Sequence, residues 1–202
     1  ITPLGTNASY PGPGNACSGW LLQDGGANVL LDCGTGVIAR VQEYLPLHEI
    51  TAVVISHMHA DHFFDLVPLR HALKYGPSNN TVHPALYLPP NGLRAMADIA
   101  SVVHGGAPDE REFISEVFQT AEFDPTATLR VGNLQLSFAP GRHYIPSWAI
   151  SLRSQDSGHR VVYTADTGPA ETVTELARDV FLYLYRRLGN NDERRRGEMA
   201  VR

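Results

Sequence analysis

The sequence has no long apolar run and few cysteines. No stretch approaches the roughly 20 consecutive apolar residues that a membrane-spanning helix needs, so no such helix is expected. The two cysteines, Cys17 and Cys33, are too few for a disulfide framework and are not at metal-ligand spacing from each other. We expect both to be buried free thiols in a reducing compartment, which favours a cytoplasmic location.

Positive charge is also scarce. Lys and Arg number 16 against 21 Asp and Glu, which gives a formal net charge of −5. This balance opposes broad electrostatic capture of nucleic acid, because such capture usually needs a basic patch. The basic cluster near the end, Arg186, Arg187 and Arg194 to Arg196, is expected to be a solvated tail or helix face.

The patterning favours one α/β domain over residues 1–202, because no linker or fixed-period repeat interrupts it. Strands are expected at 16–22 and 28–34, as a hairpin, and at 50–56, 83–90, 118–125, 127–140, 148–154 and 159–166. Helices are expected at 36–46, 65–76, 91–103 and 170–188. Sheets in the middle with helices outside would follow from this order.

The segment "ISHMHADHFFD" (55–65) places three histidines within six residues, directly after a buried strand. His57 and His59 alternate, so in an extended chain both can face one ion. Asp61 and His62 come as the next helix begins and can reach a second ion nearby. Imidazole and carboxylate suit zinc, manganese or iron. A histidine-rich surface loop, or a set of hydrogen-bonded core histidines, is the alternative, and the density of ligand types after a buried strand argues against both.

"SHMHADH" resembles the His-x-His-x-Asp-His motif of the metallo-β-lactamase fold superfamily. "LLDCGTG" (30–36), "GRHYIPSWAISL" (141–152) and "VVYTADTGP" (161–169) resemble further segments of that superfamily, in the same order. The pattern is most similar to ribonuclease Z and its phosphodiesterase-like relatives. This resemblance implies an αββα sandwich with a dinuclear metal site along one edge.

The resemblance also implies a ligand set. His57, His59 and His143 would hold a first ion, Asp61 and His62 a second, and Asp166 would bridge the two. Asp32 would support the ligand loop through hydrogen bonds without binding metal itself.

The end of the chain departs from the pattern. The superfamily has a terminal histidine ligand for the second ion, and no histidine follows His159. Glu198, in "RRGEMAVR", stands where that histidine is expected and is a candidate substitute ligand. We therefore expect a sandwich that is incomplete at its C-terminus and one or two bound ions, with zinc favoured.

These features favour a hydrolase that uses a metal-bound hydroxide, with Asp61 orienting the nucleophile and accepting its proton. Phosphodiesters are the first choice of substrate, as small molecules or short chains. Lactones, thioesters or β-lactams are the alternative, and a metal-impaired binding module is a second. Only 22 residues separate His143 from Asp166, so the tRNA-binding arm that ribonuclease Z carries there has no room, and tRNA is disfavoured. The sequence is also compatible with a homodimer.

Overall fold

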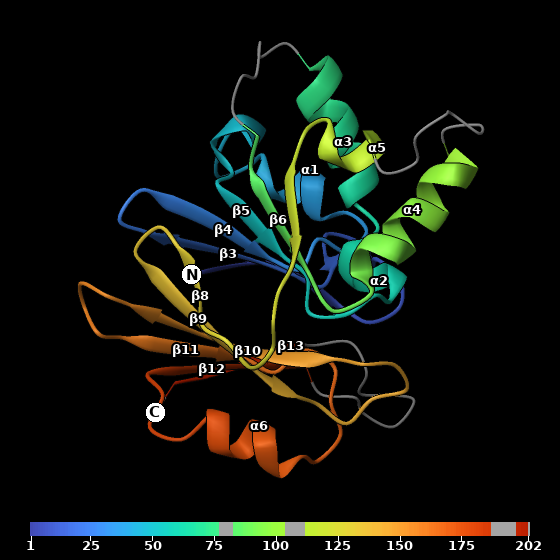
Figure 1. Ribbon diagram of the computed structural model, residues 1–202. Helices are drawn as coiled ribbons and strands as arrows, with labels where there is room; N and C mark the ends of the chain where they lie inside the picture. Colours follow the sequence, from blue (N-terminus) through green and yellow to red (C-terminus); the bar gives the residue numbers. More distant parts are fainter. Residues whose placement is uncertain (77–82, 104–111, 187–196, 202) are drawn as a thin grey trace.

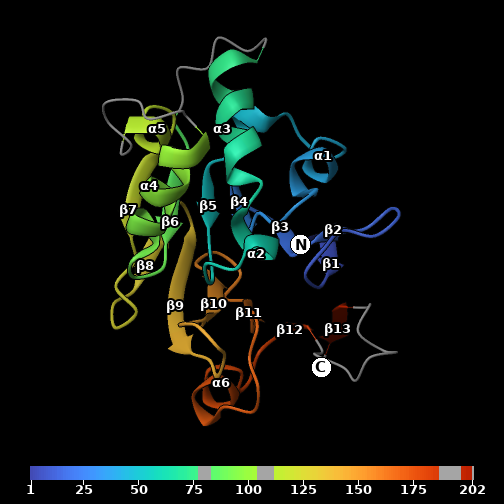
Figure 2. The same cartoon turned by 90° about the vertical axis from the view of Figure 1, so that its right-hand side faces the viewer.

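Two β-sheets pack face to face, with helices on the outer face of each (Figure 1). The computed structural model describes residues 1–76, 83–103, 112–186 and 197–201. The same four layers are seen from the side in Figure 2. This confirms the αββα sandwich that the sequence predicts.

The first sheet has seven strands in the order β2-β1-β3-β4-β5-β6-β7. Its central pairs, β4 with β5, β5 with β6 and β6 with β7, are parallel, and β3 with β4 forms the predicted antiparallel hairpin. The strands span Thr2–Asn7 (β1), Ala16–Cys17 (β2), Gly19–Asp24 (β3), Ala27–Leu31 (β4), Ala52–Val54 (β5), Ala85–Leu88 (β6) and Gln119–Glu122 (β7).

The second sheet has six strands in the order β13-β12-β11-β10-β9-β8. It is antiparallel except for the parallel pair of β11 and β12. The strands span Leu129–Val131 (β8), Leu134–Pro140 (β9), Trp148–Ser154 (β10), Arg160–Tyr163 (β11), Leu182–Arg186 (β12) and Gly197–Val201 (β13).

Helices cover the outer face of the first sheet, and one helix lies below the second (Figures 1 and 2). On the first sheet lie α1 (Val37–Val41), α3 (Leu66–Tyr75), α4 (Gly92–Val103) and α5 (Glu112–Ser115). The helix α6 (Glu171–Leu176) packs against β9 and β10. A 3-10 turn at Leu47–Glu49 and the short helix α2 (Ala60–Phe63) complete the set. The predicted helix at 36–46 is thus shorter than expected.

The central strands are buried on both faces, which explains their unbroken apolar sequence. In β4, Leu30 packs among the helices, whereas Val29 and Leu31 pack between the sheets. In β5, Val53 points to the helices and Val54 to the second sheet. Successive side chains of a strand point to opposite faces, so both faces of these strands need apolar residues.

The predicted helix over 170–188 is wrong beyond its first turns. The helix α6 ends at Leu176, and Asp179 takes a left-handed backbone with φ of 53°. The chain then forms β12, which pairs parallel with β11, so that Leu182 and Leu184 are buried between the sheets. The two buried leucines of "FLYLY" are two residues apart, which matches a strand, and the pairing gives β11 a hydrogen-bonded neighbour that a helix there could not provide.

Two further expectations concern cysteines and membranes. Cys17 and Cys33 are both buried and are not joined by a disulfide bond, as predicted. Within the described part of the chain, no helix has the length and apolar character needed to span a membrane. Of the basic cluster, Arg186 ends β12, and Arg187 and Arg194 to Arg196 lie outside the described residues.

Candidate metal centre

The predicted ligands lie where strands of both sheets end. His57 and His59 follow β5, and His62 lies on α2. His143 lies in the loop between β9 and β10, and Asp166 follows β11. The carboxyl ends of strands that run in the same direction meet at one edge of a sheet, which is where open α/β folds place their sites.

Backbone hydrogen bonds hold these loops against each other. The amide of Trp148, at the start of β10, donates to the carbonyl of Ser56 in the loop after β5. The amide of Gly168 donates to the carbonyl of Arg142, and the amide of Arg142 donates to the Thr167 hydroxyl. The loops that carry His57, His143 and Asp166 are therefore fixed relative to one another by the chain itself.

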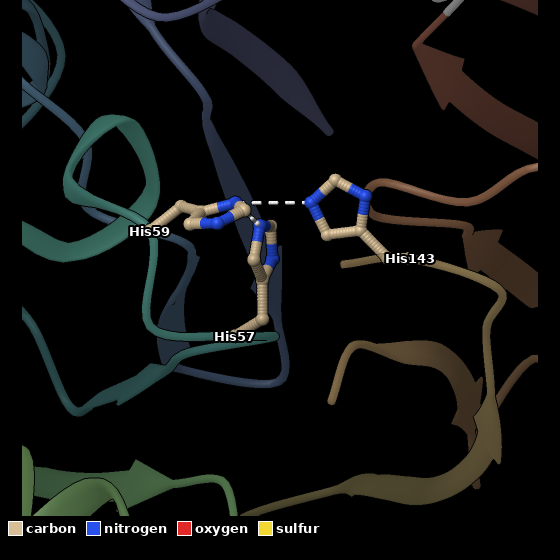
Figure 3. Close-up of side chains that lie close together, drawn as sticks. All are labelled: His57, His59 and His143. Atoms are coloured by element: carbon tan, nitrogen blue, oxygen red, sulfur yellow. Dashed lines mark hydrogen bonds between the residues drawn. The ribbon is translucent and has the colours of Figure 1, made fainter. Parts of the chain in front are cut away.

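Three imidazoles converge in the first group. His59 Nδ1 lies 3.2 Å from His57 Nε2 and 2.9 Å from His143 Nε2 (Figure 3). Nitrogen ligands of a tetrahedral zinc, each about 2.0–2.1 Å from the ion, are separated by about 3.3–3.4 Å. The spacing and the chemistry of these three nitrogen atoms therefore fit a shared divalent ion.

The second group contains His57, His62 and Asp166, whose candidate ligand atoms all lie within 4.8 Å of one another. Asp166 faces both groups: its Oδ1 lies 3.4 Å from His62 Nε2, and its Oδ2 lies 3.9 Å from His143 Nε2. Asp61 Oδ2 lies 3.8 Å from His62 Nε2. The structure thus brings all six predicted ligands together, and the carboxylate of Asp166 lies between His62 and His143.

Asp32 lies beneath the ligands and is fully buried. Its Oδ2 lies 2.6 Å from His62 Nδ1 and also accepts hydrogen bonds from Ser56 Oγ and Tyr163 Oη. Its Oδ1 accepts the amide proton of Ser56. Asp32 has a φ of 58°, a left-handed conformation that is uncommon for residues other than glycine and concentrates at functional sites. This placement agrees with the supporting role predicted for it.

The two buried histidines have opposite pKa shifts in the metal-free protein. Burial, together with the neighbouring His62, lowers the pKa of His57 to about 2. Burial also acts to lower the pKa of His62, but Asp32 and Asp166 outweigh it and raise the pKa to about 9. His57 therefore keeps a lone pair at neutral pH, whereas His62 must lose a proton when a metal binds.

Three residues around the centre are absent from the predicted set. Ser56 and Tyr163 contact Asp32 through their hydroxyl groups, and the amide of Ser9 donates to Asp61 Oδ2 at 2.7 Å. Tyr163 could have been identified from the sequence, because a tyrosine in a buried strand usually needs a hydrogen-bond partner for its hydroxyl group. Ser9 could not have been identified in this way, because it contacts Asp61 through its backbone amide.

Glu198, the candidate substitute ligand, lies in β13 at the edge of the second sheet. Its backbone pairs with Tyr185 of β12. The chain around it is therefore a strand instead of a loose tail, and its role as a ligand stays a prediction.

Comparison with known proteins gives a consistent picture. The probable metallo-hydrolase YhfI of Bacillus subtilis is 27% identical over 188 residues, covering 91% of this chain and 70% of YhfI. Ribonuclease Z of Methanopyrus kandleri is 26% identical over 145 residues, covering 71% of this chain and 46% of that enzyme.

Solved structures agree on the fold. The crystal structure of YhfI, described as a metallo-β-lactamase fold protein, superposes with a TM-score of 0.75 at 24% identity, over 90% of this chain and 69% of YhfI. Human tRNase Z, short form (ELAC1), gives a TM-score of 0.69 at 22% identity, over 90% of this chain and 75% of that structure.

The sequence profile of one family, described as anti-Pycsar protein Apyc1, matches residues 1–186, which is most of the chain. The sandwich and its cluster of histidines and aspartates fit a branch that resembles ribonuclease Z. The chain belongs to the anti-Pycsar protein Apyc1 family, within the metallo-β-lactamase fold.

Proposed function

We propose that this chain is a metal-dependent hydrolase that cleaves phosphodiester bonds. The observation that carries the proposal is the position of Asp166, whose two oxygen atoms face His62 on one side and His143 on the other. This geometry suits two adjacent divalent ions, an arrangement common among enzymes that cleave phosphate esters. The ribonuclease Z relative supports the same substrate class.

Each side chain has a definable part in that reaction. His57, His59 and His143 would hold one ion, and His62 and Asp61 the other, with Asp166 between them. Zinc is the first choice because imidazole and carboxylate are its usual ligands. When bound, the ions supply Lewis-acid activation of a water molecule and of a phosphoryl oxygen.

Asp61 is the proposed catalytic base. Its side chain is 12% exposed, so it reaches the open side of the centre, whereas the side chain of His62 is fully buried. A carboxylate in this position can orient the attacking water and take its proton. The amide of Ser9 fixes Asp61 in place by donating to Oδ2.

The loops around the centre favour a small or short substrate over tRNA. Between His143 and Asp166 the chain forms only the tight hairpin of β10 and β11, and no long arm projects there. The net charge of −5 also disfavours a polyanionic partner.

Hydrolysis of bis(p-nitrophenyl) phosphate by zinc-loaded or manganese-loaded protein tests the proposal, with a lactone and a chromogenic cephalosporin in parallel. We expect turnover of the phosphodiester, its loss in excess chelator, and a fall of about 10²–10⁴-fold in Asp61→Ala. Asp156→Ala, at an exposed aspartate in the β10–β11 turn, is the matched control. Turnover of the lactone or the cephalosporin alone would reassign the substrate, and full activity in chelator would refute a metal hydrolase.

A further inference from the structure

One buried carboxylate oxygen connects both groups of ligands. Asp32 Oδ2 receives contacts from His62 Nδ1 at 2.6 Å, Tyr163 Oη at 2.6 Å and Ser56 Oγ at 2.9 Å. Ser56 Oγ in turn lies 3.0 Å from His57 Nδ1. His57 belongs to both groups of ligands and His62 to the second alone, and the ring orientation of each depends on the same oxygen atom.

The directions of these hydrogen bonds follow from which atoms carry protons. A carboxylate only accepts, so the hydroxyl proton of Ser56 must point to Asp32. The Ser56 oxygen is then an acceptor for His57, and His57 must carry its proton on Nδ1. The lone pair of His57 is thereby placed on Nε2, the atom that faces His59 Nδ1 at 3.2 Å.

The same reasoning applies to His62. Its Nδ1 donates to Asp32, so the nitrogen left to bind metal is Nε2, which faces Asp166 at 3.4 Å. A donor bond on one ring nitrogen is the usual way in which a protein selects the nitrogen that binds a metal.

Tyr163 comes from the opposite sheet. It lies in β11, three residues before Asp166, and is 1% exposed, whereas Asp32 follows β4 of the first sheet. The hydrogen bond from Tyr163 to Asp32 therefore joins the two sheets directly beneath the centre. It fixes the end of the strand that presents Asp166 relative to the oxygen that orients His62.

We propose that Ser56 and Tyr163 are positioning residues of the metal centre. Through Asp32, the Ser56 hydroxyl selects the tautomer of His57, and the Tyr163 hydroxyl holds the carboxylate that orients His62. Neither side chain is proposed to touch metal or substrate. Because the proposed hydrolysis needs the ions in place, these roles deepen the proposed function and rest on it.

The test measures metal binding and needs no substrate. Ser56→Ala and Tyr163→Phe each remove one oxygen atom, and zinc affinity is determined by competition with a chromogenic chelator. We expect each variant to bind zinc about 10–100-fold more weakly, the usual cost of losing a group that orients a ligand. Ser151→Ala and Tyr87→Phe, on strands β10 and β6, are matched controls and should bind zinc as the unmodified chain does.

Proton NMR of zinc-loaded protein with ¹⁵N-labelled histidine provides a readout that a general loss of stability would not reproduce. The unmodified chain should show protected Nδ1 protons for His57 and His62. Ser56→Ala should lose the His57 signal and keep that of His62, whereas Tyr163→Phe should shift the His62 signal.

Unchanged zinc affinity in both variants, or a His57 signal that survives in Ser56→Ala, would overturn the assignment. Failure of the proposed function is a separate outcome. In that case zinc affinity and the proton signals would respond as expected while no phosphodiester is cleaved.

Discussion

The amide of Ser9 donates a 2.7 Å hydrogen bond to Oδ2 of Asp61, across 52 residues of sequence. Ser9 lies in the loop after β1 and has a left-handed backbone with φ of 64°. The N-terminal loop therefore fixes the proposed catalytic base through its backbone, independently of the serine side chain.

This contact predicts opposite outcomes for two substitutions of Ser9. Ser9→Gly keeps the N–H group and suits a positive φ, so its activity should match that of the unmodified chain. Ser9→Pro lacks the N–H group and cannot adopt this φ. Losing a hydrogen bond to a charged group costs about 1.5–3 kcal/mol, so kcat/KM of Ser9→Pro should fall about 10–100-fold. Equal kcat/KM values in a phosphodiesterase assay would contradict a role for this amide.

The pKa values of His57 and His62 predict a stability maximum near pH 6.5 for metal-free protein. The pKa of His62 is raised to about 9, so its contribution is complete below pH 6.5 and is lost as the pH rises towards 9. The pKa of His57 is lowered to about 2, so unfolded chains bind the extra proton below pH 6.5, and stability falls as the pH drops. Urea unfolding of chelator-treated protein at pH 5, 6.5 and 9 measures this.

The variant His62→Gln tests the loss of stability above pH 6.5 separately from the loss below pH 6.5. It should remove the loss of stability between pH 6.5 and 9 and leave the loss below pH 6.5 in place. A steady rise in stability up to pH 9 in the unmodified chain would show that His62 is not held as an imidazolium by Asp32 and Asp166.

Gly34 has no space for a side chain. A Cβ atom there would overlap the carbonyl oxygen of Asp61 and lie 2.7 Å from its carbonyl carbon and 2.8 Å from Cys17 Cβ. Gly34→Ala should therefore displace the backbone of the ligand loop, lowering both the melting temperature and zinc affinity. In Gly26→Ala, at the β3–β4 turn, the Cβ meets open space but φ is 84°, so only a backbone cost of about 1–2 kcal/mol is expected, with zinc affinity unchanged.

Unequal metal occupancy is also predicted. The first group offers three imidazoles whose nitrogen atoms are 2.9 and 3.2 Å apart, whereas the second relies on His62 with two carboxylates, one of them 3.8 Å away. After dialysis, metal analysis should give closer to one zinc per chain than two. Two tightly held ions would contradict this, and a return to one ion in Glu198→Ala would then identify the additional ligand.

The clustering of the candidate ligands could be predicted from the sequence because four metal-binding side chains lie close together in one segment. Three histidines and an aspartate directly after a buried strand form a set of metal-binding side chains that a surface loop or an apolar core rarely needs. His143 and Asp166 follow from segments that resemble one superfamily. This prediction depends on residue types alone, so it does not require the helices and strands to be predicted correctly.

The other features depended on contacts that residue type does not show. Ser9 acts through an amide that every residue other than proline possesses. The strand β12 was predicted as helix because "VFLYLY" is apolar enough for either structure, and its pairing with β11 decided the outcome. Tyr163 lies 131 residues from Asp32 in sequence, so their contact required the two sheets to be docked.

The division of the ligands between the two sheets has a consequence for the timing of synthesis. His143 contacts His59 across 84 residues, so the first group of ligands cannot form until the chain has been synthesised beyond strand β9. At a typical synthesis rate of about 5–20 residues per second, the nascent chain displays His57, His59, Asp61 and His62 alone for roughly 4–17 seconds. A metal ion captured in that interval would lack His143 and Asp166, two of the six candidate ligands, so we expect the complete centre to bind metal only after the two sheets have docked.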